Sequence, residues 1–336
     1  MKHALALLSA NMKRTIALVA LIVSACAGSD ADPIIEPITQ PPAGVDSCTL
    51  ARPDFGSPAT QAELSLFAYD VNAPLNLEKT IEGAVGAVEV SAISYDSPAG
   101  GRVTGLLFIP LNRSGLRPGV VAMHGMPSKA RDLTNYATNL ANHGAVVIAI
   151  DAPFARRTGS PVLMTRQDRD EQIQLMKDLQ RAVDVLRAQP NVAADRIAYH
   201  GVSYGGAMGA LFAGIERRIK TAVLVVGNGG LVTRSTSPSD ILFMASLSCA
   251  ARVAWFREMV PIEPIRFIGL AKPTPLLLQN GQMDQFIPSA DAQLLHNAAP
   301  DPKKTLWYNA GHNLNQQALF DAHDWLVEHI GLDARN

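Results

Sequence analysis

Residues 196–208 read RIAYHGVSYGGAM, and this stretch decides how the rest of the chain is interpreted. Its pattern predicts a short strand that runs directly into a helix, with Ser203 at the turn between them. Gly201 and Gly205 flank this serine in the spacing G-x-S-x-G. Glycine at both positions lets the strand and the helix approach closely around a serine held in a strained bend. The stretch therefore predicts a serine nucleophile, provided that the chain also supplies a sheet, a base and an acid.

Short apolar runs of the kind that form buried strands alternate with helical patterns along the chain. The runs are 120–123, 145–150, 196–199, 221–226, 276–278 and 305–308, and the helical patterns lie near 133–140, 168–188 and 315–330. This alternation predicts an α/β fold with a mostly parallel sheet and helices on both faces. Two further strand-like runs, 87–95 and 102–109, predict an antiparallel hairpin that leads the sheet.

The domain is expected to span residues 49–333. Residues 49–86 show little periodicity and are expected to form an irregular lead-in. The stretch 228–272 interrupts the alternation with a helical-looking segment and prolines, and is expected to be an insert that could cap the active site.

Composition and charge limit the classes of partner and cofactor that can be expected. The 336 residues carry a formal net charge of −1, and lysine and arginine are dispersed, so no nucleic-acid partner is expected. The sequence shows no Cys/His ligand cluster, glycine-rich phosphate loop or dinucleotide fingerprint, so no metal and no cofactor are predicted. Oligomeric state is not readable from the sequence.

The N-terminus has the layout of a secretory signal, in which Lys13 and Arg14 precede an apolar run at 16–23. Met12 is an alternative start to Met1. The run ends Val-Ser-Ala-Cys at Cys26, which resembles the lipobox of bacterial lipoproteins. That resemblance implies cleavage after residue 25 and lipidation of Cys26; the alternative is an ordinary signal peptide with an incidental cysteine.

A proline-rich, acidic stretch follows, so residues 26–48 are expected to be a flexible linker. With a lipidated Cys26, we expect the protein to be exported and anchored to the bacterial cell envelope. With an ordinary signal peptide, we expect it to be periplasmic or secreted. If Cys26 is lipidated, Cys48 and Cys249 remain as an even pair in an oxidising compartment, and we expect a disulfide between them.

An acid and a base are available downstream of Ser203. Asp284 follows the run 276–278 in QNGQMDQFIP, and His312 follows the run 305–308 in NAGHNL. Ligand sites in such sheets lie beyond the carboxyl ends of the strands, so these side chains are expected at one edge. We expect Ser203 to attack a carbonyl, His312 to take its proton and Asp284 to orient the imidazole. The alternatives lie in predicted helices and are therefore disfavoured: Asp291, His296, His323 and His329.

The sequence His124-Gly125-Met126-Pro127 follows the run 120–123. In hydrolases with this arrangement of strands, the turn after this strand supplies one backbone N–H of the oxyanion hole. The residue after the nucleophile supplies the second. We assign these to Met126 and Tyr204, with Gly125 as the alternative to Met126. His124 is expected to brace the loop.

Arg156 and Arg157 follow the run 145–150 and are expected near the same edge. One of them could hold an anionic group of the substrate. The alternative is a solvated or salt-bridged loop.

These motifs together resemble serine hydrolases of the α/β-hydrolase superfamily, in the dienelactone-hydrolase-like and prolyl-oligopeptidase-like esterase branch. The resemblance rests on HGMP, GVSYGG, NGQMDQFIP, NAGH and the leading hairpin, and covers about residues 87–332. It agrees with the chain order Ser203, Asp284, His312. Dienelactone hydrolases carry a cysteine nucleophile, whereas this chain has serine. HGMP also resembles the H-G-x-P of epoxide hydrolases, which need an aspartate nucleophile that is absent from the elbow here.

The sequence therefore predicts an enzyme that cleaves small carboxylic esters through an acyl-enzyme. A peptidase or thioesterase with the same three residues is an alternative. A non-catalytic envelope binding protein on a hydrolase scaffold is a third reading, from a different class of function.

Overall fold

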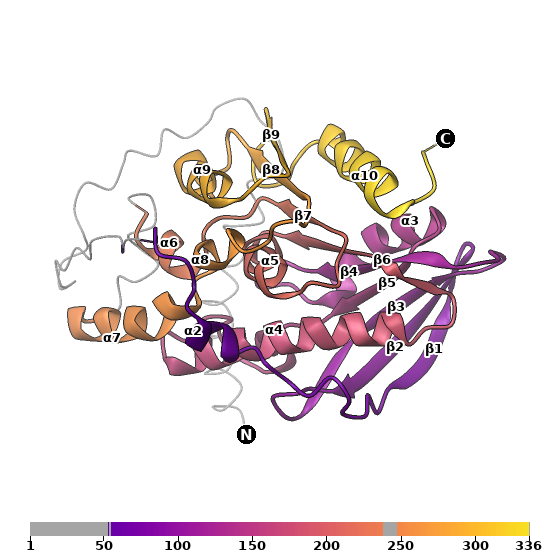
Figure 1. Cartoon of the computed structure of the whole chain (residues 1–336), viewed down its shortest axis with the longest axis horizontal. Coiled ribbons are helices and arrows are strands. Elements are labelled where there is room, and N and C mark those ends of the chain that lie inside the picture. The colour runs from indigo at the N-terminus through magenta and orange to yellow at the C-terminus, as the bar shows by residue number, and fades with distance from the viewer. Residues whose placement is uncertain (1–52, 54, 238–246, 336) are drawn as a thin grey trace, which may run out of the picture. The chain divides into compact units, whose positions relative to one another are not determined.

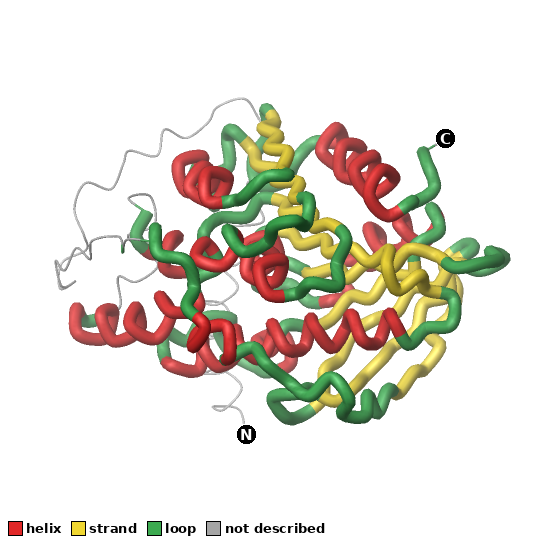
Figure 2. Tube along the Cα trace, in the orientation of Figure 1, coloured by secondary structure: helices red, strands yellow, loops and turns green. Residues whose placement is uncertain are grey.

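The computed structural model describes Pro53, residues 55–237 and residues 247–335. Its centre is a nine-stranded sheet with the strand order β1-β2-β3-β5-β4-β6-β7-β8-β9. The strands are β1 (Glu78–Val85), β2 (Val88–Asp96), β3 (Arg102–Pro110), β4 (Arg117–Met123), β5 (Val146–Ile150), β6 (Val192–Val202), β7 (Thr221–Val225), β8 (Leu276–Gly281) and β9 (Lys303–Tyr308). Figure 2 shows them as a continuous band with helices on both sides.

The sheet changes direction between its two halves. The neighbouring pairs β1–β2, β2–β3 and β3–β5 are all antiparallel. From β5 through β4, β6, β7 and β8 to β9, every pair is parallel. The predicted α/β fold is confirmed, including the parallel sheet and the leading antiparallel hairpin.

The lead-in is more regular than the sequence predicted. It contains the helix α2 (Gln61–Ser65), which starts with a capping box between Thr60 and Glu63, and the edge strand β1. Every residue of β1 is exposed. An exposed edge strand needs no apolar alternation, so the pattern that identifies half-buried strands is missing from it.

Helices cover both faces of the sheet. They are α3 (Thr134–Asn142), α4 (Arg166–Arg187), α5 (Tyr204–Ile215), α6 (Leu231–Ser235), α7 (Cys249–Met259), α8 (Ile265–Ile268), α9 (Ser289–Ala298) and α10 (Gln316–Ile330), with 3₁₀ turns η2 (Ala130–Leu133), η3 (Pro153–Arg156) and η5 (Val260–Ile262). One apolar cluster includes α4, α5 and α8, and a second includes α3 and α10. Figure 1 shows these two groups on opposite sides of the strands.

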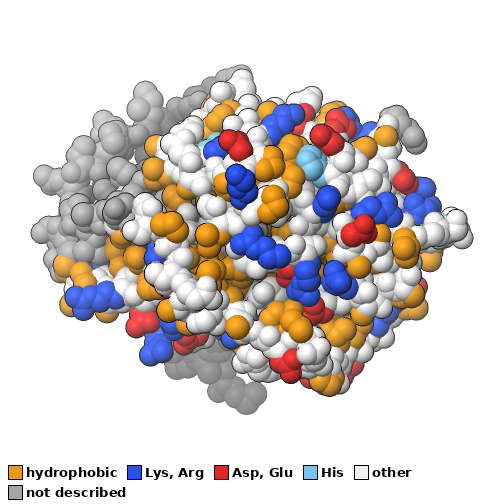
Figure 3. Space-filling model, in the orientation of Figure 1, with side chains coloured by type: hydrophobic (Ala, Val, Ile, Leu, Met, Phe, Trp, Pro, Cys, Tyr) orange, Lys and Arg blue, Asp and Glu red, His pale blue; other side chains and the backbone are white. Residues whose placement is uncertain are grey.

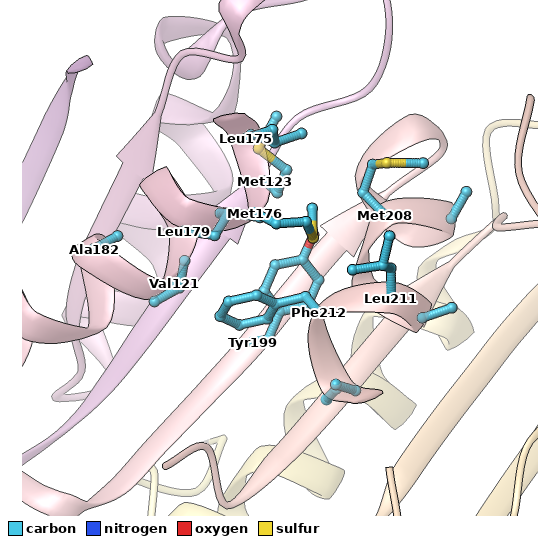
Figure 4. Packing of buried hydrophobic residues seen from close by; sticks show 14 of the residues in the cluster. Val121, Met123, Leu175, Met176, Leu179, Ala182, Tyr199, Met208, Leu211 and Phe212 are labelled. Atoms are coloured by element: carbon cyan, nitrogen blue, oxygen red, sulfur yellow. The ribbon is translucent and has the colours of Figure 1, made fainter. Parts of the chain in front are cut away.

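Large side chains from β6, α4 and α5 pack together in the first of these clusters. Figure 4 shows Tyr199 of β6 beside Phe212 of α5 and Met176 of α4. The ring centroids of Tyr199 and Phe212 are 5.1 Å apart, and all three side chains are fully buried. Burying large side chains here stabilises the junction of β6 and α5, from which Ser203 projects.

The expected insert contains α6, α7, η5 and α8, and its residues 238–246 lie outside the described part. The predicted signal segment and linker, residues 1–48, also lie outside it. None of the helices in the described part is both long enough and apolar enough to cross a membrane. Figure 3 shows Lys and Arg side chains alongside Asp and Glu across one face of the protein.

Candidate active site

Ser203 lies at the end of β6, immediately before α5, in a conformation that serine seldom adopts (φ 57°, ψ −115°). Its N–H donates to the carbonyl of Val225 at 2.8 Å, which fixes the turn against β7. A Cβ at Gly201 would lie 2.2 Å from the carbonyl oxygen of Gly205, and one at Gly205 would lie 2.4 Å from that of Met123. Both positions therefore require glycine for close packing, and the strained turn is held by its surroundings.

Asp284 follows β8 and its side chain is fully buried. Its Oδ1 accepts hydrogen bonds from the N–H groups of Phe286, at 2.8 Å, and Ile287, at 2.9 Å. Its Oδ2 lies 2.8 Å from Nδ1 of His312. The two backbone donors fix the orientation of the carboxylate, so that one oxygen always faces the imidazole.

His312 follows β9 and connects Asp284 to Ser203. Its Nε2 lies 3.0 Å from the Oγ of Ser203. Because a carboxylate only accepts, Nδ1 carries the hydrogen and donates it to Asp284. Nε2 then has its lone pair directed at the serine hydroxyl, which is the geometry that a general base requires. The structure thus brings together the three residues selected from the sequence.

The alternative acid and bases are engaged elsewhere. Asp291 and His296 lie in α9, and Nε2 of His296 contacts Oδ1 of Asn280 at 2.9 Å. His323 and His329 lie in α10, where they contact the carbonyl oxygens of Asp333 and Trp325.

His124 is buried beneath the loop that follows β4. Its Nε2 accepts a hydrogen bond from the N–H of Ala152 at 3.1 Å, so the hydrogen is on Nδ1, which donates to the carbonyl of Gly125 at 2.7 Å. Burial lowers the pKa of His124, which favours this neutral form. Both ring nitrogens are thereby used to hold the loop in place.

The same loop lies against Ser203. A Cβ at Gly125 would be 3.1 Å from the Cβ of Ser203. Met126 and Tyr204 line a cavity together with Ser203, and neither N–H donates to another group in the described part of the chain. Two unused donors beside a nucleophile are the arrangement that stabilises a developing oxyanion.

The cavity at Ser203 has a volume of about 330 Å³. Its lining is largely apolar, and Arg234 is the one charged residue among the described residues that form it. The lining residues are Met126, Pro127, Pro161, Ser203, Tyr204, Ala207, Met208, Asn228, Gly230, Leu231, Arg234, Phe286 and Ile287. The site can therefore accept a small, mainly apolar group beside the serine.

The sequence profile of the prolyl oligopeptidase family matches residues 132–321, more than half of the chain, and this range contains Ser203, Asp284 and His312. The chain belongs to the prolyl oligopeptidase family. The predicted superfamily is confirmed, and the protein is a serine hydrolase of the α/β-hydrolase type.

Several solved structures share the fold of this family member. An acetyl xylan esterase from Paenibacillus sp. R4 superposes with a TM-score of 0.65 and 20% sequence identity, covering 80% of this chain and 92% of the other. Acetyl xylan esterase 1 from Thermoanaerobacterium sp. JW/SL YS485 gives 0.64 and 18%, covering 84% and 96%. An S-formylglutathione hydrolase from Agrobacterium tumefaciens gives 0.58 and 16%, covering 76% and 100%. At these identities the likeness concerns the fold. A comparison with curated protein sequences gave no match.

The two arginines selected from the sequence do not line the cavity of this prolyl oligopeptidase family member. Arg156 forms an ion pair with the buried Asp178 at 2.5 Å, and Arg157 forms one with Glu171 at 2.5 Å. Both carboxylates lie on α4, so these arginines attach the loop after β5 to that helix. This is the salt-bridged loop that the sequence analysis gave as the alternative to a substrate contact.

Among the cavity residues that were not selected from the sequence, three carry a polar, charged or aromatic side chain. Asn228 and Arg234 lie in the expected insert, and Phe286 follows Asp284 by two residues. Phe286 is 53% exposed and its ring packs edge-on against His312, with the centroids 5.2 Å apart. An aromatic residue two positions after the predicted acid is the sequence signal that could have identified it.

Of the three cysteines, only Cys249 lies in the described part. It begins α7 and is disulfide-bonded. Cys26 and Cys48 lie outside the described residues, so pairing with Cys48 stays a prediction. In the described part of the chain, no cluster of three or more His, Cys, Asp or Glu side chains is arranged to hold a metal ion.

Proposed function

We propose that this protein hydrolyses small carboxylic esters through an acyl-enzyme on Ser203. The observation that supports this most directly is the hydrogen-bonded series from Oγ of Ser203 through His312 to Asp284, with distances of 3.0 and 2.8 Å. A serine hydroxyl needs a base within hydrogen-bond reach and a third group that orients the base.

Acylation transfers one proton twice. Oγ of Ser203 attacks the ester carbonyl carbon while its proton passes to Nε2 of His312, and the carbonyl electron pair moves onto oxygen. The N–H groups of Met126 and Tyr204 would stabilise that oxyanion, and Asp284 would stabilise the imidazolium. The tetrahedral intermediate then collapses, the bond to the alcohol oxygen breaks, and His312 gives its proton to that oxygen. A water molecule then attacks the acyl-enzyme through the same two proton transfers, which releases the carboxylic acid and regenerates Ser203.

The assignment predicts that Ser203→Ala lowers kcat for p-nitrophenyl acetate by about 10⁶-fold, since loss of the nucleophile removes the concerted action of all three residues. Steady-state turnover of purified protein measures this. Ser114→Ala, a change at an exposed loop position, is the matched control and should retain full turnover. A Ser203→Ala enzyme with wild-type turnover would overturn the proposal.

Amide and thioester bonds are the second candidate, which the family's relation to oligopeptidases favours. Competition among one ester, one peptide amide and one thioester of the same acyl group separates the three. We expect the ester to have the highest kcat/KM. The third reading, a non-catalytic binding protein, requires that a fluorophosphonate probe leave Ser203 of the folded protein unlabelled.

We also propose that the protein is exported and anchored through lipidated Cys26. This rests on the N-terminal sequence pattern. The test is incorporation of radiolabelled palmitate into the wild type and its loss in Cys26→Ser. A wild-type protein that takes up no label would overturn the lipid anchor and favour an ordinary signal peptide.

A further inference from the structure

A carboxylate, that of Glu263, is buried near the active-site cavity. Glu263 follows η5 and has no exposed surface. Within the described part of the chain no salt bridge involves it, and burial raises the pKa of its carboxyl to about 7. A buried carboxylate of this kind costs several kcal/mol unless other groups satisfy it.

The groups that satisfy Glu263 all belong to α6. Oε2 accepts from the N–H of Val232 at 3.3 Å, and Oε1 accepts from the N–H of Thr233, at 2.8 Å, and from its hydroxyl, at 2.9 Å. A helix of five residues is too short to be stable through its own hydrogen bonds. Three donors converging on one carboxylate therefore fix the start of α6.

The turn before α6 is shaped to fit the same carboxylate. Gly230 has φ +126°, and a Cβ there would lie 2.6 Å from Oε1 of Glu263. Only glycine combines this backbone conformation with so close an approach.

The segment that Glu263 holds forms one wall of the cavity. Gly230, Leu231 and Arg234 line the cavity together with Ser203. We refer to residues 230–234 as the α6 wall. The position of this wall relative to Ser203 sets how much space a bound substrate has.

Glu263 is itself attached to the helix that follows the nucleophile. It directly precedes Pro264 and α8, and the N–H of Ile265 donates to the carbonyl of Gly229 at 3.0 Å. The carbonyl of Phe267 in α8 approaches α5 so closely that a Cβ at Gly214 would lie 2.3 Å from it. Since α5 begins next to Ser203, the contacts run from Ser203 through α5 and α8 to Glu263 and the α6 wall.

The acyl half of an ester is the part that this wall would contact. The leaving alcohol must receive its proton from Nε2 of His312, so it lies on the side of His312 and the adjoining Phe286 ring. The acyl chain then extends into the remainder of the cavity, toward Leu231.

We propose that Glu263 is a positioning residue that holds the α6 wall at a fixed distance from Ser203 and so selects the length of the acyl chain. The proposal rests on the ester hydrolysis proposed above. A carboxylate used only to stabilise the fold would affect all substrates equally, whereas one that positions a wall affects long acyl chains more than short ones.

The test compares Glu263→Gln with wild type on p-nitrophenyl acetate, butyrate, hexanoate and octanoate. The amide keeps an acceptor for Thr233 but turns an NH₂ group toward the N–H of Val232, which loosens the α6 wall. We expect kcat/KM for acetate to stay within about threefold of wild type while that for the best longer ester changes by about tenfold or more, mainly through KM. Glu258→Gln, at a partly exposed carboxylate on α7, is the matched control and should leave the acyl-length profile unchanged.

Labelling of Ser203 by a fluorophosphonate probe is measured in parallel and should proceed at the wild-type rate in Glu263→Gln. An equal change for all four esters, or an unchanged profile, would overturn the proposal. If the wild type hydrolyses none of the esters, the proposed function has failed, and that outcome is distinct from an unchanged profile. Should Glu263→Gln not fold, Thr233→Val removes one donor to the same carboxylate and should shift the profile in the same direction by a smaller factor.

Discussion

The two sides of the active-site cavity are held in place by different physical means. On one side, the turn around Ser203 is fixed by backbone packing, in which Gly201 and Gly205 allow main-chain atoms to touch. On the other side, the α6 wall is fixed by the buried carboxylate of Glu263, which accepts three hydrogen bonds from it. The first arrangement is steric and carries no charge, whereas the second depends on a titratable group.

This difference separates the chemistry from the choice of substrate. Backbone packing tolerates almost no added atoms, so the nucleophile has one position. A hydrogen-bonded wall can shift by small amounts when its donors or acceptors change, so the space beside the nucleophile can vary while the reaction stays the same. Substitutions around Ser203 should therefore change kcat, whereas substitutions at the α6 wall should change the preference for acyl length.

The largest effect is expected from Asp284→Asn, on the chemical side. Two N–H donors pin Oδ1, so the asparagine oxygen must occupy that place and its NH₂ group must face His312. Nδ1 of the imidazole then has to accept, and Nε2 carries the hydrogen and no longer acts as a base. We expect kcat to fall by about 10⁴-fold.

The residual activity of Asp284→Asn should keep the wild-type acyl-length profile, because the α6 wall is untouched. Asp195→Asn, at an exposed position, is the control. A change in selectivity as large as the change in kcat would show that the two sides of the cavity are not independent.

A smaller but still large effect is expected from Gly205→Ala. The added Cβ would lie 2.4 Å from the carbonyl oxygen of Met123 and 2.9 Å from that of His124, so α5 and the oxyanion loop must separate. We expect the free energy of unfolding to fall by about 3 kcal/mol, together with a loss of kcat. Urea titration measures the first and ester turnover the second.

Gly269→Ala provides the comparison for Gly205→Ala. Its Cβ would have one neighbour, at 3.8 Å, which is ordinary contact. The free energy of unfolding should change by less than about 1 kcal/mol. Equal destabilisation by the two alanines would contradict the steric account of the elbow.

The sequence predicts those parts of the fold that are buried on both sides. The strand β5 is buried throughout and β4 and β7 at all but one position each, and their apolar runs mark them clearly. The edge strand β1 has no buried residue, so nothing in its side-chain pattern distinguished it from a loop. Burial creates the pattern that is read from a sequence, and an edge strand lacks it.

The same reasoning applies to the site. Ser203, Asp284 and His312 could be selected because each follows a recognisable strand, and parallel strands bring their carboxyl ends to one edge. Glu263 reads as an ordinary solvated acid in the proline-containing stretch PIEPIRF, since glutamate is seldom buried. Its burial follows from the packing of α8 on α5, a long-range contact that leaves no local signal.

The smallest expected effect concerns protonation of the α6 wall. Burial raises the pKa of Glu263 from its ordinary 4.5 to about 7 in the folded protein, so between these values the folded state binds more protons than the unfolded state. Stability must then fall as pH rises through this window. The favourable contribution of the protonated carboxyl is complete below pH 4.5 and is lost by about pH 7.

Comparison with Glu263→Gln isolates this contribution, because glutamine does not titrate and all other groups cancel. From pH 4.5 to pH 7, the free energy of unfolding of the wild type should fall by about 2.5 kcal/mol relative to the variant, as measured by urea titration at several pH values. The difference between wild type and Gly269→Ala, which changes no titratable group, should be flat over the same range. A flat difference for Glu263→Gln as well would contradict the raised pKa: it would mean that the hydrogen bonds from Val232 and Thr233 offset the cost of burial, so that Glu263 ionises in the folded protein as readily as in water.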